Sequence, residues 1–85
     1  MTELKETAAM MCSEDYKERF KAEYLQLAIR YEKLEKMVMD WEEGKLSFTP
    51  RCPKATYELQ LEYMRKYLSV LIMRAQIEGI DLEDK

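Results

Sequence analysis

The chain has 85 residues, of which 36% are charged and 47% are hydrophobic, and its net charge is −3. This length allows one small domain, and the apolar content is too high for a disordered chain. The acidic balance argues against binding to a DNA or RNA polymer, because such proteins usually present a basic surface.

Several stabilising devices of small proteins are missing from the sequence. It contains two isolated cysteines, Cys12 and Cys52, no histidine and no C-x-x-C motif, so we expect neither a disulfide framework, nor a metal site, nor a cofactor. No uncharged stretch approaches the length that crosses a membrane. A chain this short buries only about 60% of its unfolded surface, which leaves association with other copies as the expected source of stability.

The elements in chain order predict an all-α fold. Residues 1–12 are compatible with a short helix that has Leu4, Ala8 and Met11 on one side, and Ser13 is the expected N-terminal cap of the next element. Residues 14–43 contain no glycine or proline and predict a long helix, which Gly44 ends. Its apolar seam has heptad spacing and consists of Phe20, Tyr24, Leu27, Tyr31, Leu34, Val38 and Trp41.

The second half of the chain predicts a connector and a second long helix. Residues 44–53 contain Gly44, Pro50 and Pro53, so they form an extended connector, whose apolar Leu46 and Phe48 we expect to fold onto the helices. Residues 54–78 form the second helix, with Pro53 at its start. Gly79 followed by Ile80 predicts a glycine cap with a hydrophobic closing contact, and residues 79–85 form a polar tail. The seam of the second helix consists of Tyr57, Leu61, Met64, Leu68, Leu71 and Ala75.

Pairing the two seams gives a long antiparallel helical hairpin in a single domain. The second helix also carries another apolar row, made of Leu59, Tyr63, Val70, Met73, Ile77 and Ile80. An exposed row of this length is a liability on a monomer, so we expect it to be buried against other copies in a homo-oligomeric bundle. The alternative is a monomer in which the N-terminal helix folds back over the row.

The sequence offers little for catalysis. Without histidine the commonest general base is missing, and the carboxylates have the spacing of solvated helix faces, so we expect a binding protein and not an enzyme. One turn near a helix N-terminus carries Tyr16, Arg19 and Phe20. The free N–H groups of a helix N-terminus and a guanidinium favour an anion, and an aromatic ring can stack on a base. The candidate ligand-binding residues are Tyr16, Arg19, Phe20, Lys33, Tyr67 and Arg74. The alternative is that Tyr16 and Phe20 extend the core while Arg19 and Arg74 pair with Glu23 and Glu78.

Polar positions of both helices carry a resemblance. The runs YKERFKAEY, RYEKLE and ELQLEYMRKYLSVLIMR resemble a family of small helical bacteriophage proteins first named from crAss-like phages. The family pattern, early Y-x-x-R with a following acidic residue, then K-L, then Q-L-x-x-M-x-x-Y and a later arginine, falls on Tyr16, Arg19, Glu23, Lys33, Leu34, Gln60, Leu61, Met64, Tyr67 and Arg74. The acidic residue follows Arg19 by four positions instead of two, and the likeness covers about residues 15–78.

This resemblance implies a phage origin and the host cytoplasm. A looser likeness of architecture links the chain to phage anti-CBASS and anti-Thoeris nucleotide sponges, which hold cyclic immune signals without cleaving them. It implies an anti-defence protein that sequesters a cyclic oligonucleotide or a cyclic ADP-ribose-type signal between copies. The alternative function is an interaction module that inhibits a host protein through the apolar row.

Overall fold

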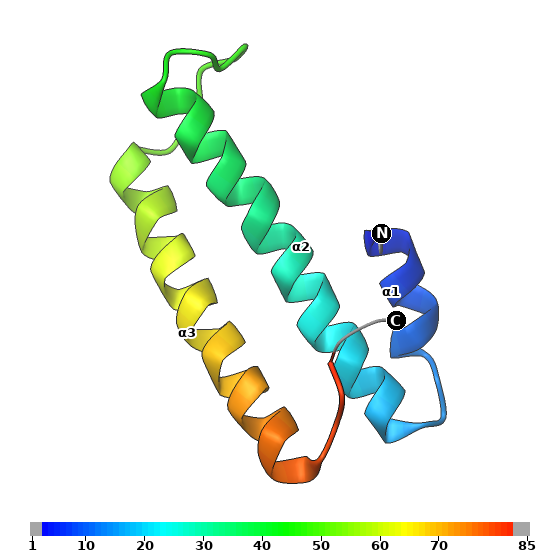
Figure 1. Cartoon of the computed structure of the whole chain (residues 1–85). Helices are drawn as coiled ribbons and strands as arrows, with labels where there is room; N and C mark the ends of the chain where they lie inside the picture. Colours follow the sequence, from blue (N-terminus) through cyan, green and yellow to red (C-terminus); the bar gives the residue numbers. More distant parts are fainter. Residues whose placement is uncertain (1–2, 83–85) are drawn as a thin grey trace.

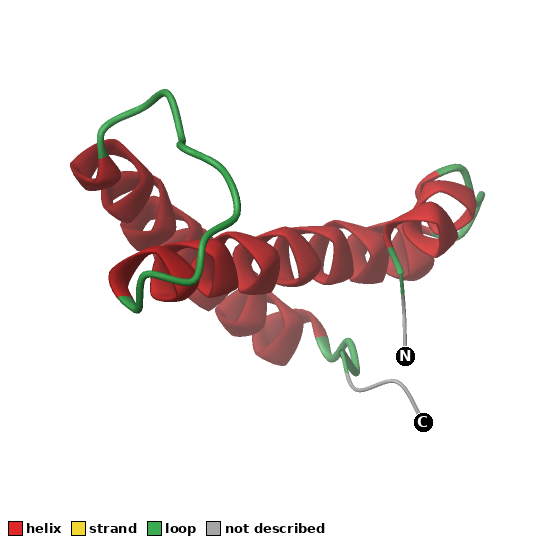
Figure 2. Ribbon diagram, turned by 90° about the horizontal axis from the view of Figure 1, so that it is seen from above, coloured by secondary structure: helices red, strands yellow, loops and turns green. Residues whose placement is uncertain are grey.

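The computed structural model describes residues 3–82, and every element of regular structure in that range is a helix (Figure 1). The helices are α1 (Leu4–Met11), α2 (Tyr16–Glu42) and α3 (Lys54–Glu78). The two long helices lie side by side and run in opposite directions, and α1 packs on the other side of α2. The connector lies at one end of the molecule and the turn between α1 and α2 at the other (Figure 2).

The start of α2 differs from the prediction. Asp15, not Ser13, is the N-cap residue, and its carboxylate accepts a hydrogen bond of 3.0 Å from the backbone N–H of Lys17. The Ser13 hydroxyl instead accepts from the backbone N–H of Asp15. An aspartate is as good a cap as a serine, and its negative charge also favours the positive end of the helix.

Glycines end both long helices. Gly44 has a φ of 72° and Gly79 a φ of 70°, the left-handed conformation that terminates helices and that other residues adopt at a cost. Beyond Gly79 the chain reverses, and the backbone N–H of Ile80 donates to the carbonyl of Ala75 at 2.8 Å. Pro53 occupies the N-cap position of α3, one residue before the position predicted for it.

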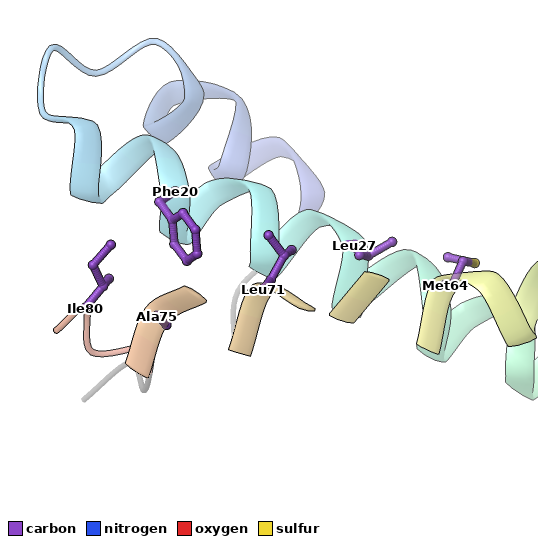
Figure 3. Packing of buried hydrophobic residues seen from close by; sticks show 6 residues of the cluster. All are labelled: Phe20, Leu27, Met64, Leu71, Ala75 and Ile80. Atoms are coloured by element: carbon purple, nitrogen blue, oxygen red, sulfur yellow. The ribbon is translucent and has the colours of Figure 1, made fainter. Parts of the chain in front are cut away.

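The core lies between the two predicted seams. Phe20 and Leu27 of α2 pack against residues of α3, and the turn after α3 completes the cluster (Figure 3). Its buried members are Phe20, Leu27, Met64, Leu71, Ala75 and Ile80, with Tyr24, Tyr31, Leu34 and Leu68 partly buried beside them. At the connector end the rings of Trp41 and Tyr57 meet edge to face, 6.2 Å apart.

Two predictions about side chains, for Ile80 in the apolar row and for Phe48, are wrong, whereas the predicted closing contact of Ile80 after the Gly79 cap is confirmed. Ile80 is buried in the core instead of belonging to the exposed row, because the left-handed turn at Gly79 points it inward. In α1 the buried residue is Thr7, whereas Ala8 and Met11 are exposed. The Thr7 hydroxyl donates to the carbonyl of Leu4, which makes its burial inexpensive. In the connector Leu46 is half-buried, but Phe48 is 56% exposed.

The rest of the apolar row stays exposed. We name Leu59, Tyr63, Val70, Met73 and Ile77 the outer stripe, and their exposed fractions range from 49% to 77%. The N-terminal helix does not cover them, since α1 contacts α2 and makes no contact with α3 through its backbone in the described part of the chain. The homo-oligomeric bundle therefore stays a prediction.

Candidate functional site

Four of the six predicted ligand-binding residues line one small cavity. It has a volume of about 270 Å³ and lies where the first turns of α2 meet the last turns of α3. The first turn of α2 carries Tyr16, Arg19 and Phe20, and the last turns of α3 carry Arg74. The lining consists of Met11, Tyr16, Arg19, Phe20, Glu23 and Arg74.

Arg74 is the central cation of the cavity. Its guanidinium lies over the ring of Phe20, with 4.8 Å from Cζ to the ring centroid. Nη2 donates to the hydroxyl of Tyr16 at 2.9 Å, and Nε donates to the carboxylate of Glu78 at 3.4 Å. Burial lowers the pKa of Arg74, but the bonds to Tyr16 and Glu78 outweigh it and raise the pKa overall. The side chain therefore remains a fixed positive charge.

Tyr16 connects the two helices at this end. Its hydroxyl donates to Oε1 of Glu78 at 2.8 Å while it accepts from Arg74. Its ring centroid lies 6.3 Å from that of Phe20, and the residue is 46% exposed. We name Tyr16, Arg74 and Glu78 the terminal clasp. Glu78 is the member that sequence reasoning placed only as an alternative partner of Arg74.

Arg19 is an exposed residue of the cavity lining. Its Nη1 donates to the backbone carbonyl of Ser13 at 2.7 Å, which fixes the side chain against the turn before α2. A guanidinium has five N–H donors, and this bond uses one of them, while Arg74 uses two. Both arginines thus retain donors for an anion. Arg19 does not pair with Glu23 in the described structure.

Tyr67 and Glu23 form the neighbouring wall. The Tyr67 hydroxyl donates a short hydrogen bond to Oε2 of Glu23, which lines the cavity. This bond, helped by partial burial, raises the pKa of Tyr67. Tyr67 is therefore beside the cavity and not in it. The sequence indicated Glu23 as a position of the family pattern and as an alternative partner of Arg19. Its bond to Tyr67 depends on the register of the two helices, which the sequence does not state.

Lys33 is the predicted site residue that the fold places elsewhere. It lies thirteen positions after Phe20 on α2, about 20 Å along the helix. It lines a second, larger hollow of about 840 Å³ between α1 and α2. The outer stripe, predicted as an oligomer interface, is exposed on α3 and lines none of the hollows described in this section.

Other site types find no support in residues 3–82. No group of three histidine, cysteine, aspartate or glutamate side chains is arranged to hold a metal ion within that range. None of the helices described has the length and apolarity needed to cross a membrane.

Comparison with known proteins identifies a family. A family model described as Sequestin matches residues 14–77, which are 64 of the 85 residues and include nearly all of both long helices. The chain belongs to the Sequestin family, whose name indicates that its members sequester a molecule. No curated protein and no solved structure gives a significant match. The matched range contains every residue that lines the small cavity except Met11.

Proposed function

We propose that this member of the Sequestin family is a phage anti-defence protein that sequesters a cyclic nucleotide-type immune signal in the host cytoplasm without cleaving it. The observation that carries the proposal is the pairing of Arg74 and Arg19 with the rings of Tyr16 and Phe20 at one cavity. Guanidinium groups bind phosphates in a bidentate manner, and an aromatic face offers a surface for a base.

The charges of the cavity favour an anion. Its lining has two guanidinium groups and one carboxylate, Glu23, which already accepts the hydroxyl of Tyr67. Arg74 is held in place by the terminal clasp and by Phe20, so a ligand does not have to immobilise a flexible side chain. Such preorganisation increases affinity because it lowers the entropy lost on binding. The net charge of −3 does not oppose this, since the local field determines where an anion binds.

The small volume supports a site shared between copies. About 270 Å³ is less than the roughly 300–1,000 Å³ of complete small-molecule sites. One copy thus accommodates a base or a phosphate and its sugar, but not a whole cyclic dinucleotide. A homo-oligomer in which a second copy contributes the remaining contacts fits this proposal. Sequestration also requires no catalytic group, and the cavity brings together no nucleophile with a general base.

A thermal-shift panel tests the proposal. The purified protein is heated with cyclic di- and trinucleotides, cyclic ADP-ribose isomers and their linear counterparts. A ligand at 100 times its Kd stabilises by about 2.7 kcal/mol, which for a domain of this size raises the Tm on the order of 10 °C. We expect one signal class to give such a shift and to be recovered intact after denaturation.

Two variants localise the site. Arg19→Ala and Arg74→Ala are expected to lose the shift while keeping the helical circular dichroism spectrum. The matched control is Arg51→Ala, which removes an exposed arginine of the connector at the other end of the molecule and is expected to bind normally. A flat panel contradicts the sequestration of these signals. A shift that survives Arg74→Ala contradicts this site.

A further inference from the structure

The small cavity contains one group that a simple anion site does not need. Its lining, drawn from residues 3–82, has a single carboxylate, the half-buried Glu23, beside Arg19 and Arg74. No lysine or arginine nitrogen of the described residues forms an ion pair with this carboxylate. A negative charge in the same lining offsets part of the attraction of the two guanidinium groups for a bare phosphate or sulfate. Glu23 therefore favours a ligand that carries more than an anion.

The carboxylate of Glu23 is held in place and still has free acceptor capacity. Its Oε2 accepts a hydrogen bond from the hydroxyl of Tyr67 on α3, whereas its Oε1 accepts none from any residue in the range that the structure describes. A carboxylate offers about four lone-pair sites, and this bond uses one of them. An acceptor that is fixed in advance costs a ligand less entropy than a mobile one. Glu23 is thus suited to accept N–H groups of a bound molecule.

The spacing of the charges on α2 defines what the ligand must present. Arg19 and Glu23 are four positions apart, which places their Cβ atoms about 6 Å from each other on one side of the helix. A ligand that engages both needs an anionic group and, one helical turn away, N–H donors. Inorganic phosphate has no such donors. A nucleotide has a phosphate at one end and the donor-bearing edge of its base at the other.

The bases differ in the donors that they offer to a carboxylate. Guanine presents its N1–H and an amine N–H side by side, so each oxygen of one carboxylate accepts one of them. Oε2 of Glu23 retains a lone pair for this purpose beside its bond to Tyr67. Adenine and cytosine offer an amine next to a ring nitrogen that is an acceptor, and uracil has its N3–H between two carbonyl oxygens. A carboxylate repels these acceptors, so Glu23 favours guanine.

We infer that Glu23 is the specificity-determining residue of the cavity and that the sequestered signal carries a guanine. The N1–H and the amine of this base donate to the Glu23 carboxylate, while a phosphate binds Arg19 and Arg74. Tyr67 is a positioning residue, which holds the carboxylate from outside the lining. The inference rests on the proposed function and names the base of its ligand. It favours cyclic oligonucleotides over cyclic ADP-ribose-type signals, whose base is adenine.

The first experiment compares signals that differ in their bases. Isothermal titration calorimetry measures the Kd of the unaltered protein for the signals of the thermal-shift panel, which include cyclic di-GMP, cyclic di-AMP, cyclic di-UMP and cyclic ADP-ribose. We expect a guanine-containing signal to bind most tightly. Its inosine analogue lacks the amine but keeps the N1–H, so we expect its binding to be roughly tenfold weaker.

The outcomes separate this inference from the proposed function. If a signal without guanine binds most tightly, or if the inosine analogue binds as well as the guanine signal, the inference is overturned and the proposed function stands. If no signal of the panel binds, both are overturned. The inosine comparison uses the unaltered protein, so it is decisive even where a variant does not fold.

A conservative variant assigns the preference to Glu23. Glu23→Gln keeps an oxygen that accepts from Tyr67 but replaces the second acceptor by an amide N–H donor. We expect it to bind the guanine signal about tenfold to a hundredfold more weakly and to reduce the preference over the inosine analogue. The matched control is Glu18→Gln, which neutralises an exposed glutamate of α2 outside the lining and is expected to bind like the unaltered protein.

Three results with variants overturn the inference, provided that circular dichroism shows the variant to be helical. If Glu23→Gln binds all signals more tightly, Glu23 acts only as a repelling charge. If it weakens all signals equally, the residue acts only on the structure of the cavity. Tyr67→Phe keeps the carboxylate, so we expect weaker binding at an unchanged ratio between guanine and inosine. A ratio that falls in Tyr67→Phe and not in Glu23→Gln shows that Tyr67 reads the base.

Discussion

The two faces of α3 are almost equally apolar but lie in different surroundings. The inner face carries Leu61, Met64, Leu71 and Ala75, all buried, and the outer stripe carries five apolar residues that are about half exposed or more. Apolar character therefore does not decide which face is inside. The inner face is buried because the apolar seam of α2 packs against it, whereas no helix of the described chain packs against the outer stripe. The inner face stabilises the single chain, and the outer stripe remains exposed on it.

Among substitutions that distinguish the two faces of α3, the largest loss of stability is expected at Leu71, which has no exposed surface. Leu71→Ala removes core contacts and leaves a cavity, so we expect a loss of roughly 3 kcal/mol in the free energy of unfolding. Val70→Ala, at the neighbouring and exposed position, is expected to change it by less than about 0.5 kcal/mol at low protein concentration. Urea titration of both variants measures the contrast. Equal losses would show that the two faces are not distinct.

The second effect concerns Ile80, which the heptad pattern assigned to the exposed row and the structure buries. Ile80→Ala is expected to cost about 2 kcal/mol, because it removes buried aliphatic atoms from the core. Ile77→Ala, in the outer stripe and 77% exposed, serves as the matched control and is expected to have little effect at low protein concentration. Thermal unfolding compares the two variants, and a reversed order contradicts the inward turn at Gly79.

The third effect concerns Gly79, whose left-handed backbone ends α3. An added Cβ at Gly79 meets no atom within 4 Å, so the cost of Gly79→Ala is the left-handed backbone alone, roughly 1–2 kcal/mol. Gly79→Asn is expected to cost less, because asparagine tolerates this conformation better. Chemical denaturation distinguishes the two substitutions. Equal stability of Gly79→Ala and the unaltered chain would mean that α3 ends differently.

The smallest effect concerns Tyr67, at the border between the two faces. Its pKa is raised above the ordinary value of 10.0 by the hydrogen bond to Glu23, so the folded chain holds the proton more tightly than the unfolded chain. The resulting stability is complete below pH 10.0 and is lost as the pH rises through the raised pKa. Tyr67→Phe is expected to abolish this part of the alkaline loss. The test compares the denaturant midpoints of unfolding of Tyr67→Phe and of the unaltered chain at about pH 9 and about pH 11.

The heptad spacing predicts the all-helical fold and most of the core, because burial repeats with the helix period. Leu27 and Leu71 are buried as the seams predict. The spacing cannot place Ile80, because a left-handed glycine changes the direction of the chain and ends the periodicity. Lys33 is a different case: fourteen positions of one predicted helix, about 21 Å, separate it from Arg19, so its distance from the site already follows from the sequence.

The candidate site is only partly predictable for the same reason. The turn with Tyr16, Arg19 and Phe20 is local, so the sequence indicates it. The bonds of Tyr16 to Arg74 and Glu78 join residues about sixty positions apart, and they depend on the relative register of two helices. A shift of one turn would place other residues of α3 against Tyr16. The signal for Glu78 was its i,i+4 spacing from Arg74, which the structure confirms as an ion pair.

The position of α2 between its neighbours has an energetic consequence. Because α1 and α3 each pack on α2 and not on each other, substitutions at the two interfaces are expected to act additively. The small cavity is different, since Met11 of α1, Phe20 of α2 and Arg74 of α3 all line it. A molecule bound there links two otherwise independent interfaces. Double-mutant cycles across α1 and α3 should then show coupling with ligand present and none in its absence.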